Sequence, residues 1–208
     1  MNEKIVYADI FSAAWKGLKS QIWLLAGLLI GFTIIYSLLL QFAVPAKGEA
    51  ISISGIIVMI LCVLLEGLFV MGYLRNCLQT LEGEEPQFSE YGKVSRLLLR
   101  YLAAWLLTSV MMMIGLALFI LPGIYLVLRF QFVYASIVDE DVGILTSFKR
   151  SWRMTKGHVL PLLVILLIQM LIITIGILAL GIGIFVAVPL ILLMYAQTYK
   201  KLIAPATL

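Results

Sequence analysis

Long apolar runs alternate with short polar segments along the whole chain. Residues 22–42 form an uncharged run of 21 residues. A helix of that length measures roughly 30 Å, the thickness of the hydrocarbon core of a bilayer. Five further apolar runs follow, at residues 51–74, 97–121, 124–138, 159–179 and 184–198. The pattern predicts an all-α membrane protein with six transmembrane helices in a single domain, residues 1–208.

Two polar segments have the pattern of helices that lie in the headgroup region. Residues 5–19 place apolar side chains, among them Trp15, at helical spacing. A tail helix without lipid contact is the alternative for this segment. Residues 142–158 place an apolar stripe on one side of a helix, formed by Leu145, Phe148, Trp152 and Thr155. The first apolar run is longer than the roughly 7–15 residues of a signal peptide, so we expect it to be retained.

The other side of the segment 142–158 is basic. Its positive residues are Lys149, Arg150, Arg153 and Lys156. A basic amphipathic helix binds an anionic membrane surface, so we expect these four side chains to contact anionic lipids. Charges that serve only to set the topology would give the same pattern.

Lysine and arginine are distributed very unequally between the two sides of the predicted membrane. Of 15 such residues, 13 lie on the side that holds both termini, Lys47 lies on the other side and Arg129 lies within a span. Because basic loops remain in the cytoplasm, this distribution predicts a multi-pass protein of the cytoplasmic (inner) membrane with both termini cytoplasmic.

Composition agrees with a chain dissolved in lipid and limits its chemistry. The chain is 63% hydrophobic and 12% charged, with a mean hydropathy of +1.11, whereas soluble domains carry about 25% charged residues. One histidine and two cysteines argue against a zinc site. No nucleotide-binding loop, nucleophile–base pair or paired catalytic carboxylates are visible. We therefore expect a protein without enzymatic activity, cofactor, metal or nucleic-acid partner.

A spacing of 61 residues recurs in the chain. Tyr73, Tyr134 and Tyr195 are separated by this interval, and each lies near the cytoplasmic end of an even-numbered span. Trp15 and Trp152 align in the corresponding interfacial segments. The spacing predicts three parallel repeats of an interfacial helix and a helical hairpin, approximately residues 5–80, 86–140 and 142–200. Chance alignment is the alternative, because interfacial aromatic residues are common; we expect all five to anchor the chain at the interface.

Glu66 and Arg129 are the two charges placed well inside predicted spans. Each costs about 2.5–3.5 kcal/mol at the bilayer centre, so both should face protein or water. Measured from Tyr73 and Tyr134, their depths differ by only about 3 Å. We expect a buried ion pair that sets the register of the second and fourth spans. A transport or proton site, and unpaired residues that reach water or headgroups, are the alternatives.

Four further polar residues lie near the middle of spans: Thr108, Ser109, Gln131 and Gln169. Together with Glu66 and Arg129 they would line a small central cavity. Hydrogen bonds between neighbouring helices are the alternative, and these contribute about 0.6 kcal/mol each.

Several motifs in the later part of the chain resemble known proteins. They are Gly72-Tyr-Leu-Arg75, Leu121-Pro-Gly-Ile-Tyr125, Arg129, Ser147-Phe-Lys-Arg-Ser-Trp152 and Lys156-Gly157. The pattern covers about two-thirds of the chain and resembles uncharacterised six-span membrane proteins of bacteria and archaea. It is also similar to the membrane domain fused to some glycerophosphoryl diester phosphodiesterases. The resemblance implies a compact helical module associated with lipid metabolism or envelope physiology, without the hydrolase activity of those fusions.

These observations predict a non-enzymatic scaffold or lipid-interacting module. A small transporter or channel that uses Glu66 and Arg129 is the alternative. The expected partners are membrane lipids, and a protein partner or a homo-oligomer is left open.

Overall fold

The computed structural model describes residues 5–43, 52–179 and 181–203. In chain order its elements are α1 (Tyr7–Ala43), α2 (Ile53–Glu82), α3 (Ser89–Val94), the 3-10 turn η1 (Ser95–Leu97), α4 (Leu98–Leu118), α5 (Ile120–Phe130), α6 (Val133–Glu140), α7 (Ile144–Met154), α8 (Val159–Leu178) and α9 (Ile184–Ile203). No strand occurs in these ranges. The predicted outer loop with Lys47 lies outside the described residues.

Six helical stretches are long and apolar enough to cross a membrane. They are Tyr7–Ala43, Ile53–Glu82, Ser89–Ala117, Ile120–Glu140, Val159–Leu178 and Ile184–Ile203. The prediction of an all-α chain with six apolar helices is therefore confirmed.

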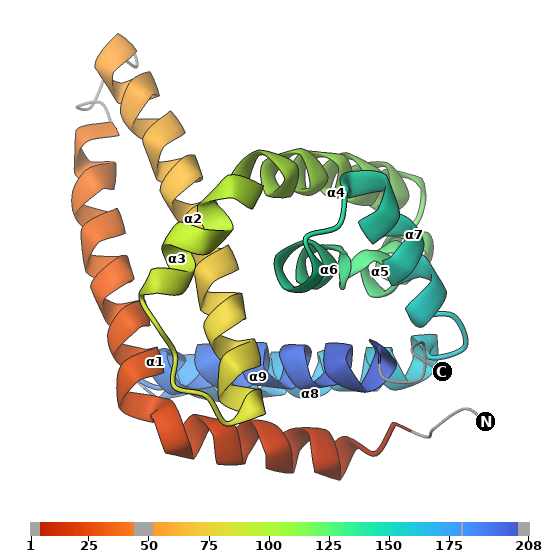
Figure 1. Cartoon of the computed structure of the whole chain (residues 1–208). Coiled ribbons are helices and arrows are strands. Elements are labelled where there is room, and N and C mark those ends of the chain that lie inside the picture. The colour runs from red at the N-terminus through yellow and green to blue at the C-terminus, as the bar shows by residue number, and fades with distance from the viewer. Residues whose placement is uncertain (1–4, 44–51, 180, 204–208) are drawn as a thin grey trace.

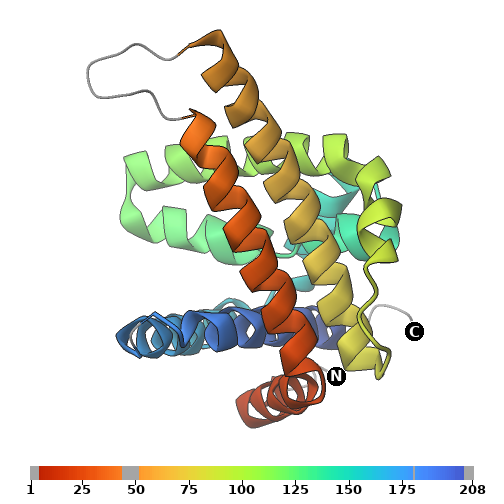
Figure 2. The ribbon, with the colours of Figure 1, turned by 90° about the vertical axis from the view of Figure 1, so that its left-hand side faces the viewer.

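The helices pair as antiparallel hairpins. In Figure 2 the end of α1, the α4–α5 turn and the α8–α9 turn lie toward the left, whereas α2 and α9 end toward the right. In Figure 1 the α1–α2 hairpin rises on the left, while α8 and α9 run across the lower part of the molecule. Arg75, Lys200 and the acidic residues after Val138 belong to the ends opposite the turns, so one end of the molecule is strongly charged.

α1 is divided into two segments by a bend at Gln21, where φ is −131° and ψ is 21°. Figure 1 shows the first segment along the bottom of the molecule and the second turning upward beside α2. Residues 7–20 therefore form a separate segment, at the place of the interfacial helix predicted for residues 5–19. Ile10, Ala14 and Leu18 on this segment are buried, so one of its faces packs against protein.

Burial is concentrated at the charged end. The largest fully buried side chains include Tyr73, Tyr199 and Phe132. By contrast, Ile34 and Ile57, on the outer parts of α1 and α2, are exposed. Exposed apolar side chains in a span are stable against lipid tails, because lipid tails are as apolar as leucine. The charged end therefore holds the packed core, and the parts of α1 and α2 far from it carry an exposed apolar surface that is compatible with contact to lipid.

Candidate functional site

The fourth apolar stretch is broken near its centre. α5 ends at Phe130 and α6 begins at Val133, so the backbone groups at the break lose their helical partners. Ser151 of α7 takes their place: its hydroxyl donates to the carbonyl of Arg129 at 2.8 Å and accepts from the N–H of Phe132 at 3.3 Å. The Thr155 hydroxyl also reaches the Arg129 carbonyl, at 3.3 Å. Broken helices are tolerated at membrane depth only when protein or water satisfies such groups.

α9 closes the other side of the break. The Tyr195 hydroxyl donates to the carbonyl of Gln131 at 2.7 Å, and the ring of Tyr195 stacks on Phe132 with centroids 5.3 Å apart. Side chains of α7 and α9 therefore provide hydrogen-bond partners for the backbone groups at the break from two directions.

Arg129 lies beside this break and is only 2% exposed. Its guanidinium carbon is 3.9 Å from the centroid of the Trp152 ring and 5.7 Å from that of Tyr125. The two rings are nearly perpendicular, with centroids 6.0 Å apart. Aromatic faces attract a cation, with about 2 kcal/mol or more when the cation is desolvated. The position of Arg129 in the last turn of α5 adds attraction to the negative end of the helix dipole.

The predicted ion pair between Glu66 and Arg129 is not formed. Neither residue occurs in the ion pairs within 4.0 Å of the described chain. Glu66 is exposed and accepts a long hydrogen bond, 3.4 Å, from the hydroxyl of Tyr36 on α1. Depth along the helix was the basis of the prediction, but the direction around the helix decides the contact: Arg129 faces α7 and Glu66 faces α1.

The four other mid-span polar residues do not form one shared site. The Thr108 hydroxyl donates within its own helix to Ala104, at 2.7 Å, and the Gln131 amide to Leu128, at 3.0 Å. Ser109 is half-buried. Among the hydrogen bonds between described residues, Gln169 alone of the four bonds to another helix, donating from α8 to the carbonyl of Ile191 in α9 at 3.2 Å. The alternative of hydrogen bonds between helices therefore applies to Gln169.

The three tyrosines have internal contacts where the sequence suggested contact with headgroups. Tyr73 is 1% exposed and donates to the carbonyl of Leu25 at 3.0 Å. Tyr195 bonds to the broken span, and the half-buried Tyr134 packs on Tyr101 with ring centroids 5.3 Å apart. The interpretation of Tyr73 as an interfacial anchor is therefore wrong, because its hydroxyl is satisfied inside the protein.

The tryptophans remain candidates for the interface. Trp15 and Trp152 are both partly exposed, and the Lys19 ammonium lies 5.4 Å from the ring centroid of Trp15. Each offers an amphipathic ring of the kind that lies at headgroup level.

An acidic triplet at the end of α6 forms the centre of an ion-pair network. Asp139 accepts from Arg75 at 2.9 Å. Glu140 pairs with Arg150 and accepts from the Tyr199 hydroxyl, the latter at 2.8 Å. Asp141 accepts from Arg96 at 2.9 Å and from Arg100 at 2.6 Å. The triplet thus contacts α2, η1, α4, α7 and α9.

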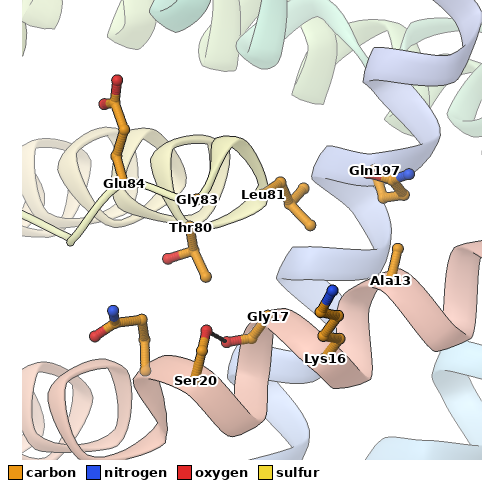
Figure 3. Close-up of a pocket in the computed structure, with 10 residues that line it drawn as sticks. Ala13, Lys16, Gly17, Ser20, Thr80, Leu81, Gly83, Glu84 and Gln197 are labelled. Atoms are coloured by element: carbon orange, nitrogen blue, oxygen red, sulfur yellow. Dashed lines mark hydrogen bonds between the residues drawn. The ribbon is translucent and has the colours of Figure 1, made fainter.

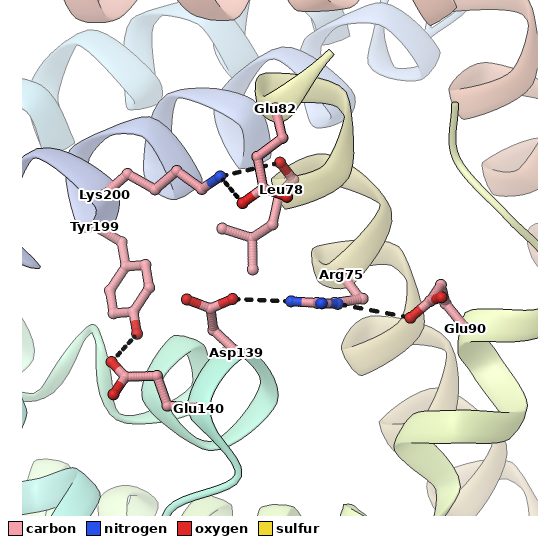
Figure 4. A network of polar contacts seen from close by, with 8 residues as sticks. All are labelled: Arg75, Leu78, Glu82, Glu90, Asp139, Glu140, Tyr199 and Lys200. Atoms are coloured by element: carbon pink, nitrogen blue, oxygen red, sulfur yellow. Dashed lines mark hydrogen bonds and ion pairs between the residues drawn. The ribbon is translucent and has the colours of Figure 1, made fainter. Parts of the chain in front are cut away.

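The network extends toward the first helices. Figure 4 shows Arg75 placed between Asp139 and Glu90, with its Nε 3.6 Å from the Glu90 carboxylate. Lys200 pairs with Glu82 at the end of α2 and donates to the carbonyl of Leu78 at 3.3 Å. Lys201 lies 3.3 Å from Asp9 of α1. Exposed ion pairs contribute about 0–1 kcal/mol each, so the network matters mainly because it joins helices that are far apart in the chain, from α1 and α2 to α9.

The buried side of α7 carries mostly small polar side chains. Ser147, Ser151 and Thr155 are fully buried together with Phe148, whereas Leu145 is 73% exposed. Ser151 and Thr155 bond the broken span, whereas the Ser147 hydroxyl donates to the carbonyl of Ile144 in its own helix. Of the predicted apolar stripe, Phe148 and Thr155 are buried in the protein, whereas Leu145 and Trp152 are exposed. Contact of this stripe with the membrane stays a prediction.

One of the four basic residues of α7 must also be reassigned. Arg150 is committed to Glu140. Lys149, Arg153 and Lys156 are exposed and belong to none of the ion pairs between described residues. Lys149 and Arg153 of α7 and Lys156 in the turn after it, which we together call the basic face of α7, remain the candidates for contact with anionic lipids.

Comparison with known proteins gives a family and no function. Residues 53–207 match the model of a domain of unknown function, DUF7847. The chain belongs to this family. No curated protein and no solved structure matches it. The family region begins with α2 and contains the broken span, the basic face and the acidic triplet. Within the described ranges, no cluster of three His, Cys, Asp or Glu side chains could hold a metal ion.

Replacing Ser151 with alanine is expected to destabilise the protein by about 1–3 kcal/mol, because the Phe132 N–H and the Arg129 carbonyl would lose a buried partner. The free energy of unfolding in detergent measures this effect. Ser95→Ala is the matched control, since the exposed Ser95 hydroxyl bonds only to Gly92 one turn earlier. Equal stability of the two variants would contradict the role of Ser151.

Proposed function

We propose that the protein is a non-enzymatic membrane module that holds its helical hairpins in a fixed arrangement and binds anionic lipid through the basic face of α7. The observation that carries this proposal is the network around Asp139, Glu140 and Asp141, which connects α6 with α2, η1, α4, α7 and α9 at one end of the molecule. A network of this kind resists relative movement of the hairpins, because several pairs must break together.

The arrangement of charges supports a lipid-binding face. The basic side chains of the network are paired with acidic partners, whereas Lys149, Arg153 and Lys156 are exposed on α7 and the turn that follows it. Clustered basic residues near a membrane surface attract anionic lipids with about 1 kcal/mol per charge.

The proposal includes a topology and an internal symmetry. We infer three related units, each an interfacial helix followed by a hairpin, in the inner membrane with both termini in the cytoplasm. The bent first segment of α1, the short helix α3 and the amphipathic α7 each precede a hairpin, which supports this inference. The charged end then faces the cytoplasm, as its excess of basic residues requires.

A scaffold has more support than a transporter that uses Glu66 and Arg129. These residues do not pair, and Arg129 is buried behind two aromatic rings. The motifs shared with six-span modules and with phosphodiesterase-linked membrane domains agree with a role in lipid metabolism or the envelope. A protein partner or a second copy would find its surface on the exposed outer parts of α1 and α2.

Lipid retention by the purified chain tests the proposal. Replacing Lys149, Arg153 and Lys156 together with glutamine is expected to lower the affinity for phosphatidylglycerol by about tenfold or more, from about 1 kcal/mol per charge. Native mass spectrometry with titrated lipid measures the affinity. Arg150→Gln is the matched control on the same helix: it should lower thermal stability and leave phosphatidylglycerol binding unchanged. Equal binding by the triple variant and the wild type would refute the lipid-binding role.

A flux assay tests the scaffold role against transport. Proteoliposomes containing the wild-type chain should show no more ion flux than empty liposomes. Protein-dependent flux that Glu66→Gln abolishes would establish the transport alternative instead.

A further inference from the structure

An open pocket of about 390 Å³ lies at the bend of α1. Three elements form its walls: the first segment of α1 up to Gln21, the C-terminal end of α2, and α9 near Gln197. Figure 3 shows Ser20 and Thr80 on opposite sides of this space. Small-molecule sites usually measure about 300–1,000 Å³, so the elbow pocket, as we call this cavity, is large enough for a small polar group.

The depth of the elbow pocket corresponds to the headgroup region. It lies where the chain passes from the segment carrying Trp15 and Lys19 into the first apolar span. Trp23, two residues beyond the bend, is 88% exposed. A lipid bound with its headgroup in the pocket would therefore find an apolar surface beside it for its acyl chains.

The pocket offers free hydrogen-bond donors on one part of its wall. The Lys16 ammonium lines the cavity and takes part in none of the ion pairs recorded for the described chain. The side-chain amide of Gln197 is also at the wall, and Figure 3 shows Gln197 on the same side of the pocket as Lys16. An ammonium and an amide together suit the oxygens of a phosphate.

Acceptors lie on another part of the same wall. The hydroxyls of Ser20 and Thr80 donate to backbone carbonyls of their own helices, Gly17 and Asn76, so toward the cavity their oxygens can only accept. Two helical segments end at the pocket, at Gln21 and at Glu82, and helix C-termini carry negative partial charge. Glu84, exposed and outside the ion pairs of the described residues, lies at the rim. These groups suit a primary ammonium.

We propose that the elbow pocket binds the zwitterionic headgroup of phosphatidylethanolamine. Its phosphate lies against Lys16 and Gln197, its ammonium donates to the Ser20 and Thr80 oxygens, and the Glu84 carboxylate at the rim adds negative charge. A simple anion would be repelled by the acceptors and the helix C-termini, and a simple cation would be repelled by the Lys16 ammonium. A group with both charges can bind the donors and the acceptors of the pocket at the same time. The inference rests on the proposed lipid-binding module, but it uses a site separate from the basic face of α7.

Titration of the purified full chain with single lipids tests the proposal by native mass spectrometry. Phosphatidylcholine is the matched probe, because it has the same phosphate and the same net charge but no N–H to donate. The wild type is expected to bind phosphatidylethanolamine about tenfold more tightly than phosphatidylcholine, as expected for a lost charge-assisted hydrogen bond. Glu84→Gln should reduce this preference several-fold, and Lys16→Ala should weaken binding of both lipids about tenfold.

Two neighbouring charges provide controls. Lys19→Ala removes an exposed lysine that rests on Trp15, and Glu85→Gln removes the carboxylate next to Glu84; neither residue lines the pocket. Both controls should bind phosphatidylethanolamine like the wild type. Equal losses in the controls, or equal wild-type affinity for the two lipids, would overturn the proposal.

Two further measurements distinguish a membrane lipid from a soluble ligand, and the elbow pocket from the basic face of α7. Soluble phosphoethanolamine should compete only at far higher concentration than the lipid; binding of the soluble compound without retention of the lipid would overturn the assignment to a membrane lipid. The variants of Lys16 and Glu84 should keep phosphatidylglycerol binding, whereas the triple variant of α7 should keep phosphatidylethanolamine binding. Failure of one site is thereby distinguished from failure of the other.

Discussion

Replacing Trp152 with alanine is expected to lower the free energy of unfolding by about 3 kcal/mol. The ring lies 3.9 Å from the Arg129 guanidinium and also packs on Phe130 and Tyr125. Its removal leaves a buried cation without its closest aromatic partner, in addition to the loss of packing. Denaturant-induced unfolding of the detergent-solubilised protein measures the change.

A double-mutant cycle isolates the contribution of the cation. Arg129→Met alone is expected to change stability by no more than about 1 kcal/mol, because the lost attraction to the rings is offset by relief from burying an unpaired charge. In that background Trp152→Ala should cost about 2 kcal/mol less than in the wild type. Trp23→Ala, at an exposed tryptophan, is the control and should be nearly neutral. Additive effects of Trp152→Ala and Arg129→Met would mean that ring and guanidinium do not interact.

Replacing Gly72 with alanine is expected to cost about 2–3 kcal/mol. A methyl group at this position of α2 would lie 2.6 Å from Cγ and Cε1 of Tyr91, and Tyr91 is itself buried between α2 and α3. The ring cannot yield cheaply, because the contact is near the base of the side chain. A shift of the thermal unfolding midpoint measures the effect.

The same substitution elsewhere in a span provides the comparison. Gly27 on α1 has no atom within 4 Å of an added methyl group, so Gly27→Ala should be neutral or stabilise the helix by about 0.5–1 kcal/mol. Combining Gly72→Ala with Tyr91→Ala should cost less than the sum of the two single changes, since the clash is removed. Equal effects of Gly27→Ala and Gly72→Ala would contradict the close approach of α3 to α2.

The positions of the six apolar helices could be predicted from the sequence because hydropathy and helix length are local properties. Each run, such as residues 22–42, has to satisfy its backbone hydrogen bonds within its own helix, because lipid offers no partners. The amphipathic character of α7 was recognisable in the same way, since helical periodicity is local too. The boundary between the third and fourth apolar helices was predicted less accurately. Residues 122–123 separate the two predicted runs, but Pro122 lies inside α5, which begins two residues earlier at Ile120.

The partners of the functional candidates could not be predicted in this way. The acidic triplet was visible in the sequence, but its contacts with Arg75, Arg100 and Tyr199 join residues far apart in the chain. The elbow pocket was missed entirely, because its polar residues come from three separate elements. The excess of polar residues at positions 16–21, just before the first span, was the only available signal.

Arg129 shows most directly where sequence and tertiary structure divide. The sequence by itself determined that a cation lies within an apolar span, at a depth where it requires a partner. Which partner it takes depends on the rotation of α5 about its axis and on the docking of α7, which brings Trp152 and Ser151 to the broken span. Rotation and docking result from the packing of all the helices together. Depth is a property of one helix, whereas contact is a property of the assembled bundle.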